Sequence, residues 1–336
     1  MKIGQAFMRE EIRKHFHHDG PFVRPDWGAL STFIEQHVPR EEQNQAWDDA
    51  VELWTAALAE NLGGDYRLTK SQRFICLSDR DEATTQWMVR FAERAEQKIR
   101  GVLRELAWGR EHKHVFLALT DEDDYDSYVS QFYSEGTFAT SIGVQIRTGL
   151  PHIVLHFIEA REALTTLAHE LSHACVSHLP MPNWLDEGVA VTLQRFIGDV
   201  PPPESLSTVQ AVWNIQSGWT PPVLWDELAD RHHAFWNEQT IQSFWAGTSF
   251  FEPGDASELS YSLAEILLHL IAQDYGNWLD FLARAHRDDA GQTAALDCFG
   301  LGLGEVAGTF LGEGDWRPVR QEIVSCWEAA GWSKQG

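Results

Sequence analysis

The chain has 336 residues, with 26 Lys and Arg against 50 Asp and Glu, and its formal net charge is −24. Nucleic acid and anionic membranes both require clustered basic residues, so we expect neither as a partner. The charge is uneven, because residues 181–336 hold 7 basic and 22 acidic residues. This half therefore favours a neutral or basic substrate, with solubility as the alternative meaning of its charge.

Targeting signals and cysteine motifs are not found in the sequence. The first 20 residues contain no apolar signal-peptide core, and no stretch approaches 18 uninterrupted apolar residues. The four Cys residues are widely spaced and form no C-x-x-C pair, which argues against a disulfide framework or a zinc ribbon. We expect a cytoplasmic protein without a membrane span, and the sequence leaves its oligomeric state open.

The first third of the chain predicts helices and two short strands. Residues 1–67 are mostly polar and have helical periodicity, with no identifiable role. Strands are predicted at Arg73–Leu77 and His114–Leu119. Between them, Asp81 caps a long amphipathic helix over about residues 82–108. The expected buried side of that helix contains Trp87, Phe91, Ala95, Ile99, Val102 and Leu106.

A hairpin and a helical half follow. The acidic run Asp121–Asp126 lacks the Gly and Glu that an EF-hand loop requires at its sixth and twelfth positions, so we interpret it as a helix start. Ala139–Arg147 and His152–Phe157 flank a turn with Gly and Pro and predict a hairpin. The expected fold is α+β, with a small mixed sheet and flanking helices, followed by a mainly helical half from about residue 183.

The strongest chemical signal is an H-E-x-x-H pattern formed by His169, Glu170 and His173. Two His four residues apart lie on one face of a helix and can bind one Zn²⁺, while the Glu between them acts on a zinc-activated water. At about 100° per residue, both His fall opposite the apolar stripe of this helix. Two solvated surface histidines are the alternative. The stripe contains Leu164, Leu167, Ala168, Leu171, Ala174 and Cys175.

A catalytic zinc has three protein ligands and one open position, and three nearby residues are candidates for the third ligand. His178 falls inside the apolar stripe of the first helix. Asp186 stands three residues after Asn183, as the acidic member of a capping box would. Glu187 therefore remains the best candidate.

The depth of Glu187 in its helix supports this choice. An antiparallel helix pair would bring Glu187 level with His173, and Gly188 would let the two helices approach closely. We therefore expect His169, His173 and Glu187 to hold one Zn²⁺ per chain.

These motifs carry a family resemblance. H-E-L-S-H-A at 169–174, followed by N-W-L-D-E-G-V-A at 183–190, resembles the gluzincin metallopeptidases, in particular the peptidase MA-like proteins with a W-L-x-E-G-x-A second motif. The strand at 152–157 and the helix at 260–276, which ends in Tyr-Gly, are similar to the family as well. The resemblance covers about residues 70–285.

The resemblance implies a zincin-like catalytic domain over residues 68–336, with a sheet-bearing half at 68–182 and a helical half at 183–336. It implies hydrolysis of peptide bonds in a peptide or protein substrate. Residues 1–67 would precede this domain as an N-terminal helical segment.

The resemblance also implies roles for single residues. Glu170 would take the proton of the zinc-activated water as general base. Gluzincins stabilise the oxyanion with a Tyr or His from the helical half, for which Tyr261 is the first choice and His232 and His233 are the second. The strand at 152–157 would lie at the sheet edge and pair with an extended peptide, or else be a plain core strand.

Aminopeptidase gluzincins carry a G-x-M-E-N segment that binds the substrate amine. The comparable segment, Gly143–Arg147, contains no acid, so an endopeptidase is favoured over an aminopeptidase. Two alternatives stay open: a catalytically silent zincin-fold binding or scaffold module, and a non-peptide zinc amidase.

Two features bear on the substrate. The acidic second half favours substrates with Lys or Arg near the scissile bond, with cleavage that weakens in salt. Five Trp residues could form an aromatic-lined cleft, with buried packing as the alternative: Trp213, Trp219, Trp225, Trp236 and Trp245.

Overall fold

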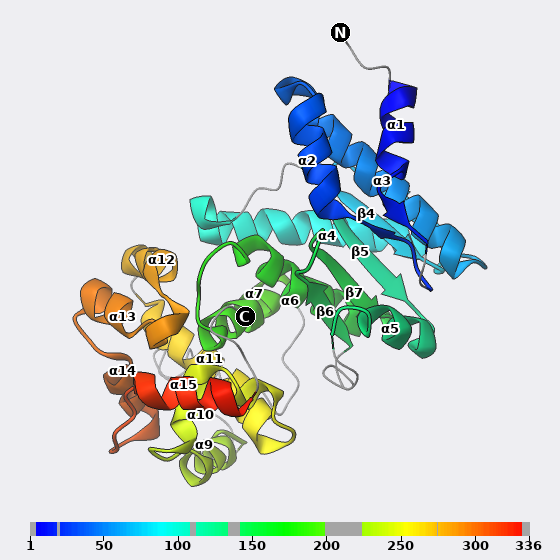
Figure 1. The fold of residues 1–336 in the computed structure, drawn as a ribbon. Coiled ribbons are helices and arrows are strands. Elements are labelled where there is room, and N and C mark those ends of the chain that lie inside the picture. Colours follow the sequence, from blue (N-terminus) through cyan, green and yellow to red (C-terminus); the bar gives the residue numbers. More distant parts are fainter. Residues whose placement is uncertain are drawn as a thin grey trace. The chain divides into compact units, whose positions relative to one another are not determined.

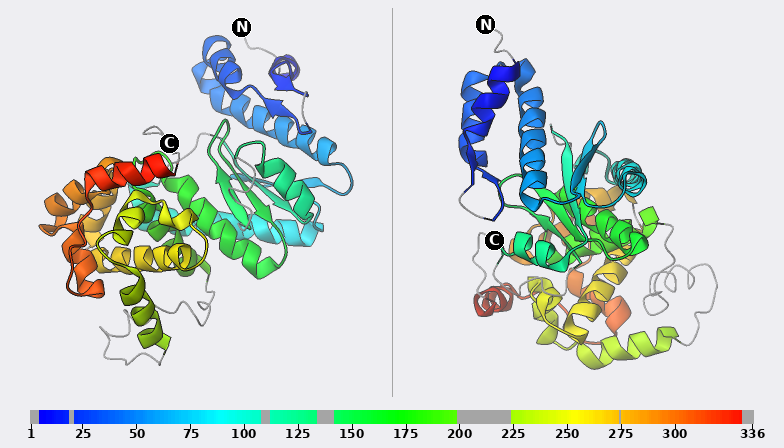
Figure 2. Two further views of the ribbon diagram at one scale, coloured as in Figure 1. Left: turned by 60° about the horizontal axis from the view of Figure 1, so that its bottom comes forward. Right: turned by 90° about the vertical axis from the view of Figure 1, so that its right-hand side faces the viewer.

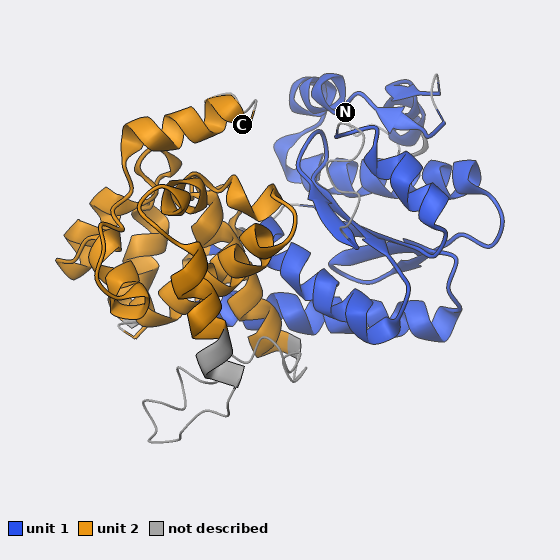
Figure 3. Cartoon of the chain, turned by 90° about the horizontal axis from the view of Figure 1, so that it is seen from below, with its two compact units in different colours: residues 1–102, 107–175 blue, residues 103–106, 176–336 orange. Residues whose placement is uncertain are grey.

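The chain folds as a mixture of α-helices and β-strands in two compact units (Figure 3). Unit 1 comprises residues 1–102 and 107–175, and unit 2 comprises residues 103–106 and 176–336. The computed structural model describes residues 5–18, 21–107, 112–133, 142–198, 224–273 and 275–330.

Unit 1 is built on a five-stranded mixed sheet with the strand order β3-β4-β5-β7-β6 (Figure 1). The three inner strands run parallel, whereas β3 and β6 are edge strands that run antiparallel to their neighbours. The predicted strands and hairpin are confirmed, although residues 139–141 lie outside the described residues. The strands are β3 (Arg67–Lys70), β4 (Phe74–Ser78), β5 (His114–Leu119), β6 (Gly143–Ile146) and β7 (His152–His156).

Helices cover both faces of this sheet. Figure 2 shows the strands between α3 on one side and α4 on the other. One face packs in a core cluster that includes Val51 and Trp54 of α3, Leu117 of β5 and Tyr128 of α5. A two-stranded hairpin, β1 (Phe16–His17) with β2 (Arg24–Pro25), lies outside the main sheet. The helices are α1 (Gln5–Arg13), α2 (Trp27–His37), α3 (Gln43–Leu62), α4 (Glu82–Leu103), α5 (Glu122–Val129) and α6 (Ala160–Val176).

Two helix starts in unit 1 follow the sequence rules for capping. Asp81 accepts a hydrogen bond from the backbone N–H of Thr84 at 2.9 Å. Asp121 accepts one from the N–H of Asp124 at 3.0 Å, so the acidic run is a helix start, as predicted. A side-chain acceptor at this position satisfies an amide that the helix itself leaves without a partner.

The long helix differs from its prediction in two respects. It ends at Leu103 rather than near residue 108, because Arg104 takes a left-handed conformation (φ 51°) that a right-handed helix does not continue. Trp87 was expected on the buried side, but 37% of it is exposed. At about 100° per residue, Trp87 falls to one side of the buried face that Thr85, Met88 and Ala92 define.

Unit 2 contains helices and no strand within its described residues. Its centre is α11, most of whose residues are buried, and α11 packs along α7. A Cβ on Gly188 of α7 would lie 3.0 Å from the carbonyl oxygen of Ala264 in α11. The helices are α7 (Asn183–Gly198), α9 (Leu224–Phe235), α10 (Thr240–Ala246), α11 (Asp255–Ile271), α12 (Tyr275–Arg284), α13 (Gln292–Phe299), α14 (Leu303–Leu311) and α15 (Arg320–Ala329).

A helix that spans a membrane must be both long and strongly apolar. No single described helix meets both requirements. The short helices α13 and α14 meet them only as a pair, and this pair is bent by 86°.

Candidate metal centre

The helix α6 has an apolar face and a second face that carries His169, Glu170 and His173. The predicted stripe is confirmed, since each of its six residues is at most 9% exposed. Glu170 and His173 are also buried, at 8% and 6% exposure, and His169 is partly buried. The alternative of two solvated histidines is therefore wrong for His173, and both imidazoles are held by the fold.

The two imidazoles point at each other. Nε2 of His173 lies 3.1 Å from Nε2 of His169, and the rings are 4.7 Å apart at an interplanar angle of 79°. Two nitrogens that bind one zinc at about 2.0–2.1 Å in tetrahedral geometry lie roughly 3.3 Å apart. The side chains therefore have nearly the spacing that a shared metal ion requires.

Glu187 completes this group. One ligand atom from each of His169, His173 and Glu187 can be chosen so that all three lie within 4.8 Å of one another. Glu187 comes from the first turn and a half of α7, which begins at Asn183. The structure thus brings together the three residues that the sequence predicted as metal ligands.

The chemistry of these donors fits zinc. Two imidazole nitrogens and one carboxylate oxygen are the donor set of a catalytic zinc site, which keeps a fourth position for water or substrate. A neutral imidazole pair and one carboxylate also leave the bound cation with net positive charge, which favours activation of water.

The start of α7 differs in detail from the prediction. The amides of Leu185 and Asp186 donate to the carbonyl oxygen of Pro182, at 3.0 and 3.1 Å. Hydrogen bonding thus begins at Pro182, one residue before the predicted cap at Asn183. Gly188 does allow a close helix approach, but its near neighbour is α11 rather than α6.

The candidates for oxyanion stabilisation differ in their surroundings. Tyr261 lies on α11, the helix that packs along α7, and its half-buried ring packs edge-on against Phe250. His232 is fully buried, and both of its ring nitrogens are in contact, with Ser262 Oγ at 3.0 Å and with Trp236 Nε1 at 3.0 Å. Burial lowers the pKa of His232 to about 3. This neutral, fully bonded ring is a packing residue, and Tyr261 remains the first choice.

His233 is exposed, with Nε2 3.3 Å from the carbonyl oxygen of Phe310. His178 is exposed just beyond the end of α6, and it is not part of the metal-ligand group. Cys175 is buried in the apolar stripe, as its place on the helix predicted.

Tyr133 of unit 1 was not predicted as a site residue, and it lies within electrostatic reach of Glu170. The hydroxyl of Tyr133 donates to the carbonyl oxygen of Gln145 in β6 at 3.2 Å. Burial raises the pKa of Tyr133, Arg147 lowers it, and the charge of Glu170 raises it. The one sequence signal was a Gln between Val144 and Ile146 in an otherwise apolar strand.

The strand before α6 is not at the sheet edge. β7 pairs with β5 on one side and with β6 on the other. The expectation that residues 152–157 form an edge strand is wrong, because β6 adds antiparallel to β7 and takes the outer position. The alternative, a core strand, is confirmed by the burial of His152 to Leu155.

The predicted aromatic cleft is not found where the structure describes the Trp residues. Trp236 and Trp245 are 3% and 1% exposed, and Trp245 packs edge-on against Trp184 at 5.5 Å. These rings form part of the core. Trp213 and Trp219, and the side chain of Trp225, lie outside the described residues.

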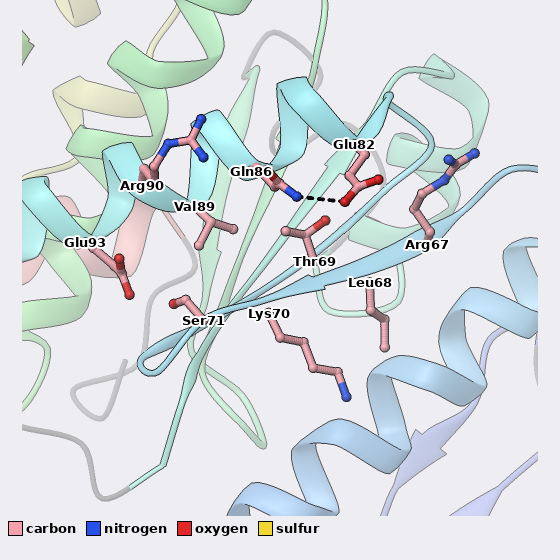
Figure 4. A pocket seen from close by; sticks show the side chains of 10 residues that line it. All are labelled: Arg67, Leu68, Thr69, Lys70, Ser71, Glu82, Gln86, Val89, Arg90 and Glu93. Carbon is pink, nitrogen blue, oxygen red and sulfur yellow. Dashed lines mark hydrogen bonds between the residues drawn. The ribbon is translucent and has the colours of Figure 1, made fainter.

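A separate hollow of about 440 Å³ lies along the other edge strand, β3, and the helix α4 (Figure 4). Arg67, Lys70 and Arg90 line it together with Glu82 and Glu93, without any His or Cys. Its lining includes no member of the metal-ligand group, so the hollow is separate from the centre on α6.

Comparisons with protein-family models, with curated proteins and with solved structures found no match to the chain. The site residues and their geometry are therefore the basis on which a function can be inferred.

Proposed function

We propose that this protein is a zinc-dependent metallopeptidase of the gluzincin type, with a zincin-like fold, that hydrolyses peptide bonds. One observation carries the proposal. His169, His173 and Glu187 converge with ligand atoms within 4.8 Å of one another, and Glu170 stands between the two histidines on α6. A binding-only zinc site has no need for this buried carboxylate.

Each residue has a distinct task in this proposal. His169, His173 and Glu187 hold the zinc. Zinc, when bound, lowers the pKa of a water molecule and polarises the scissile carbonyl. Glu170 accepts the proton of the attacking water and passes it to the leaving amine. The burial of Glu170 strengthens its interaction with that proton, because fewer water molecules compete.

Two further features concern stabilisation of the oxyanion and the choice between endopeptidase and aminopeptidase. Tyr261 is the proposed donor to the oxyanion, since its hydroxyl can donate a hydrogen bond as charge develops. The segment Gly143–Arg147 is comparable to the G-x-M-E-N segment that binds the substrate amine in aminopeptidases, but it contains no acid, which favours an endopeptidase.

The substrate is a peptide or protein with basic residues near the scissile bond. Residues 181–336 hold 7 basic and 22 acidic residues, and this excess attracts cations. Cleavage of basic peptides should therefore weaken as salt screens the attraction. Equal cleavage of acidic and basic peptides would indicate that the negative charge serves solubility rather than substrate preference.

The proposal is tested by profiling cleavage of a proteome-derived peptide mixture with the zinc-loaded wild type and with Glu170→Gln. Loss of the general base should lower the cleavage rate by about 10²–10⁴-fold, while the zinc content stays the same. Identical profiles for the two proteins would favour the alternative of a silent binding or scaffold module. Cleavage of small amides but not of peptides would favour the non-peptide amidase.

A further inference from the structure

The side-chain amide of Gln145 is buried, and only one of its two polar atoms has a hydrogen-bond partner among the described residues. Gln145 is 5% exposed. Its Oε1 accepts a hydrogen bond from Nε of Arg147 at 3.2 Å, and its Nε2 has no hydrogen-bond partner among the described residues. Because Arg147 can only donate, this contact fixes which end of the amide is the oxygen. Buried donors almost always have a partner, so this donor calls for one that the described residues do not provide.

The position of this donor follows from the neighbouring Gly143. A Cβ on Gly143 would lie 2.3 Å from Cγ2 of Thr166 in α6. Alternate residues of a strand share a face, so Gln145 points to the same side of the sheet as Gly143. The α6 side of β6 therefore carries the amide.

The register along α6 can be estimated from standard dimensions. β6 runs antiparallel to β7, and α6 turns back after β7, so that β6 and α6 run in the same direction. Two strand residues advance about 6.8 Å, which corresponds to roughly four residues of helix. Four residues beyond Thr166 is Glu170, so the amide lies level with the proposed general base.

Tyr133 supports this placement independently. Its hydroxyl bonds the backbone of Gln145 at 3.2 Å, and the same side chain lies within reach of the charge of Glu170. Tyr133 thus hydrogen-bonds the strand at Gln145 and lies within electrostatic reach of the carboxylate on α6.

We propose that Nε2 of Gln145 donates a hydrogen bond to a backbone carbonyl oxygen of the peptide substrate, beside the scissile bond. The acceptor is neutral rather than a carboxylate, because the charge of Glu170 would repel a second anion at this place. This inference rests on the proposed peptidase function and adds a substrate-binding residue to it.

The test compares two ligands that bind zinc through the same group. Acetohydroxamate offers the metal-binding group alone, whereas an N-acetylated peptidyl hydroxamate adds peptide carbonyl oxygens. Their affinities are measured by calorimetry on the zinc-loaded wild type, on Gln145→Met and on Gln86→Met. The last variant makes the same chemical change on α4, where Gln86 bonds Glu82, and serves as the matched control.

The peptidyl hydroxamate should bind Gln145→Met roughly three- to tenfold more weakly, as expected for one lost hydrogen bond. Acetohydroxamate should bind all three proteins equally, and Gln86→Met should behave as wild type. Gln145→Met should also melt no lower than wild type, because it removes a buried donor that lacks a partner. Gln145→His, which keeps an N–H donor, should recover part of the affinity.

Unchanged affinity of the peptidyl hydroxamate for Gln145→Met would overturn the inference and leave the peptidase proposal intact. An equal loss for both hydroxamates would also overturn it, since that pattern indicates a disturbed metal centre rather than a lost carbonyl contact. Failure of acetohydroxamate to bind the zinc-loaded wild type would instead refute the proposed zinc site itself.

Discussion

The two edge strands of the sheet in unit 1 have the same topology, but one is exposed and the other is buried. β3 and β6 are both four-residue strands that pair antiparallel with an inner strand. Each residue of β3 is at least partly exposed, whereas all four residues of β6 are buried. An edge strand normally exposes its polar backbone and side chains, so the burial of β6 calls for a reason beyond the sheet.

The polar side chains of the two regions explain the difference. On the β3 side, by which we mean β3, its turn into β4, and α4, polar groups bond one another, as Gln86 does with Glu82 in Figure 4. On the β6 side, formed by β6 and α6, the buried amide of Gln145 has a nitrogen without a partner among the described residues, and α6 carries the buried carboxylate of Glu170. Polar side chains that hydrogen-bond one another indicate a structural role, whereas a buried polar group without a hydrogen-bond partner indicates a binding site for a ligand.

The largest effect on stability should come from the β3 side. Glu96 is buried, and it accepts hydrogen bonds from Arg73 Nε at 2.5 Å and from Arg100 Nε at 3.0 Å, with His114 Nε2 at 3.4 Å. Glu96→Gln should lower the free energy of unfolding by about 3 kcal/mol, as measured by denaturant titration. It should leave the peptide profile of the folded protein unchanged. A change in cleavage with unaltered stability would contradict a purely structural role.

The same carboxyl predicts a dependence on pH. Burial alone would raise the pKa of Glu96, but hydrogen bonds from His114, Arg73 and Arg100 hold it below its usual value of 4.5. A depressed folded-state pKa stabilises the protein fully above the unfolded-state value, and this contribution is lost as the pH falls below it. Glu96→Gln should therefore lose less stability than wild type between about pH 4.5 and pH 2.

A smaller loss is expected where β6 meets α6. Gly143→Ala places a methyl group 2.3 Å from Thr166 and 2.9 Å from Leu155, and such overpacking costs about 2 kcal/mol. The matched control is Gly101→Ala in α4, where a Cβ would meet nothing within 4 Å. That control should be more stable by about 0.5–1 kcal/mol, as Ala favours a helix over Gly. Equal thermal unfolding of the two variants would show that β6 is free to shift.

The smallest effect should come from the hollow beside β3. Arg90 is exposed on its α4 wall, and Arg90→Ala should change the free energy of unfolding by less than about 0.5 kcal/mol. Cleavage of the peptide mixture should be the same as for wild type. A clear loss of cleavage would indicate that part of the substrate-binding site lies on the β3 side, and it would contradict the contrast between the two edges.

Local features were predictable from the sequence. The apolar stripe of α6, the helix start at Asp121 and the metal-ligand group with Glu187 follow from spacing, capping and chemistry over a few residues. Each depends on rules that act within one helix or between two consecutive helices.

Long-range features were not predictable. Strand order places β7 inside the sheet and β6 at its edge, and a single strand pattern cannot specify its neighbours. Gly188 indicated a close helix contact, but not that its partner is Ala264, 76 positions later. That Nε2 of Gln145 has no partner among the described residues depends on every group around the amide, which no motif specifies.

The most direct test of the central claim is the zinc content of purified protein after zinc loading and removal of excess metal. Elemental analysis should find about one zinc per chain in wild type and far less in His169→Ala. His178→Ala should keep the full content, since this nearby histidine is outside the ligand group. Wild type without stoichiometric zinc, or His169→Ala with as much zinc as wild type, would contradict the claim that α6 and α7 hold a catalytic metal.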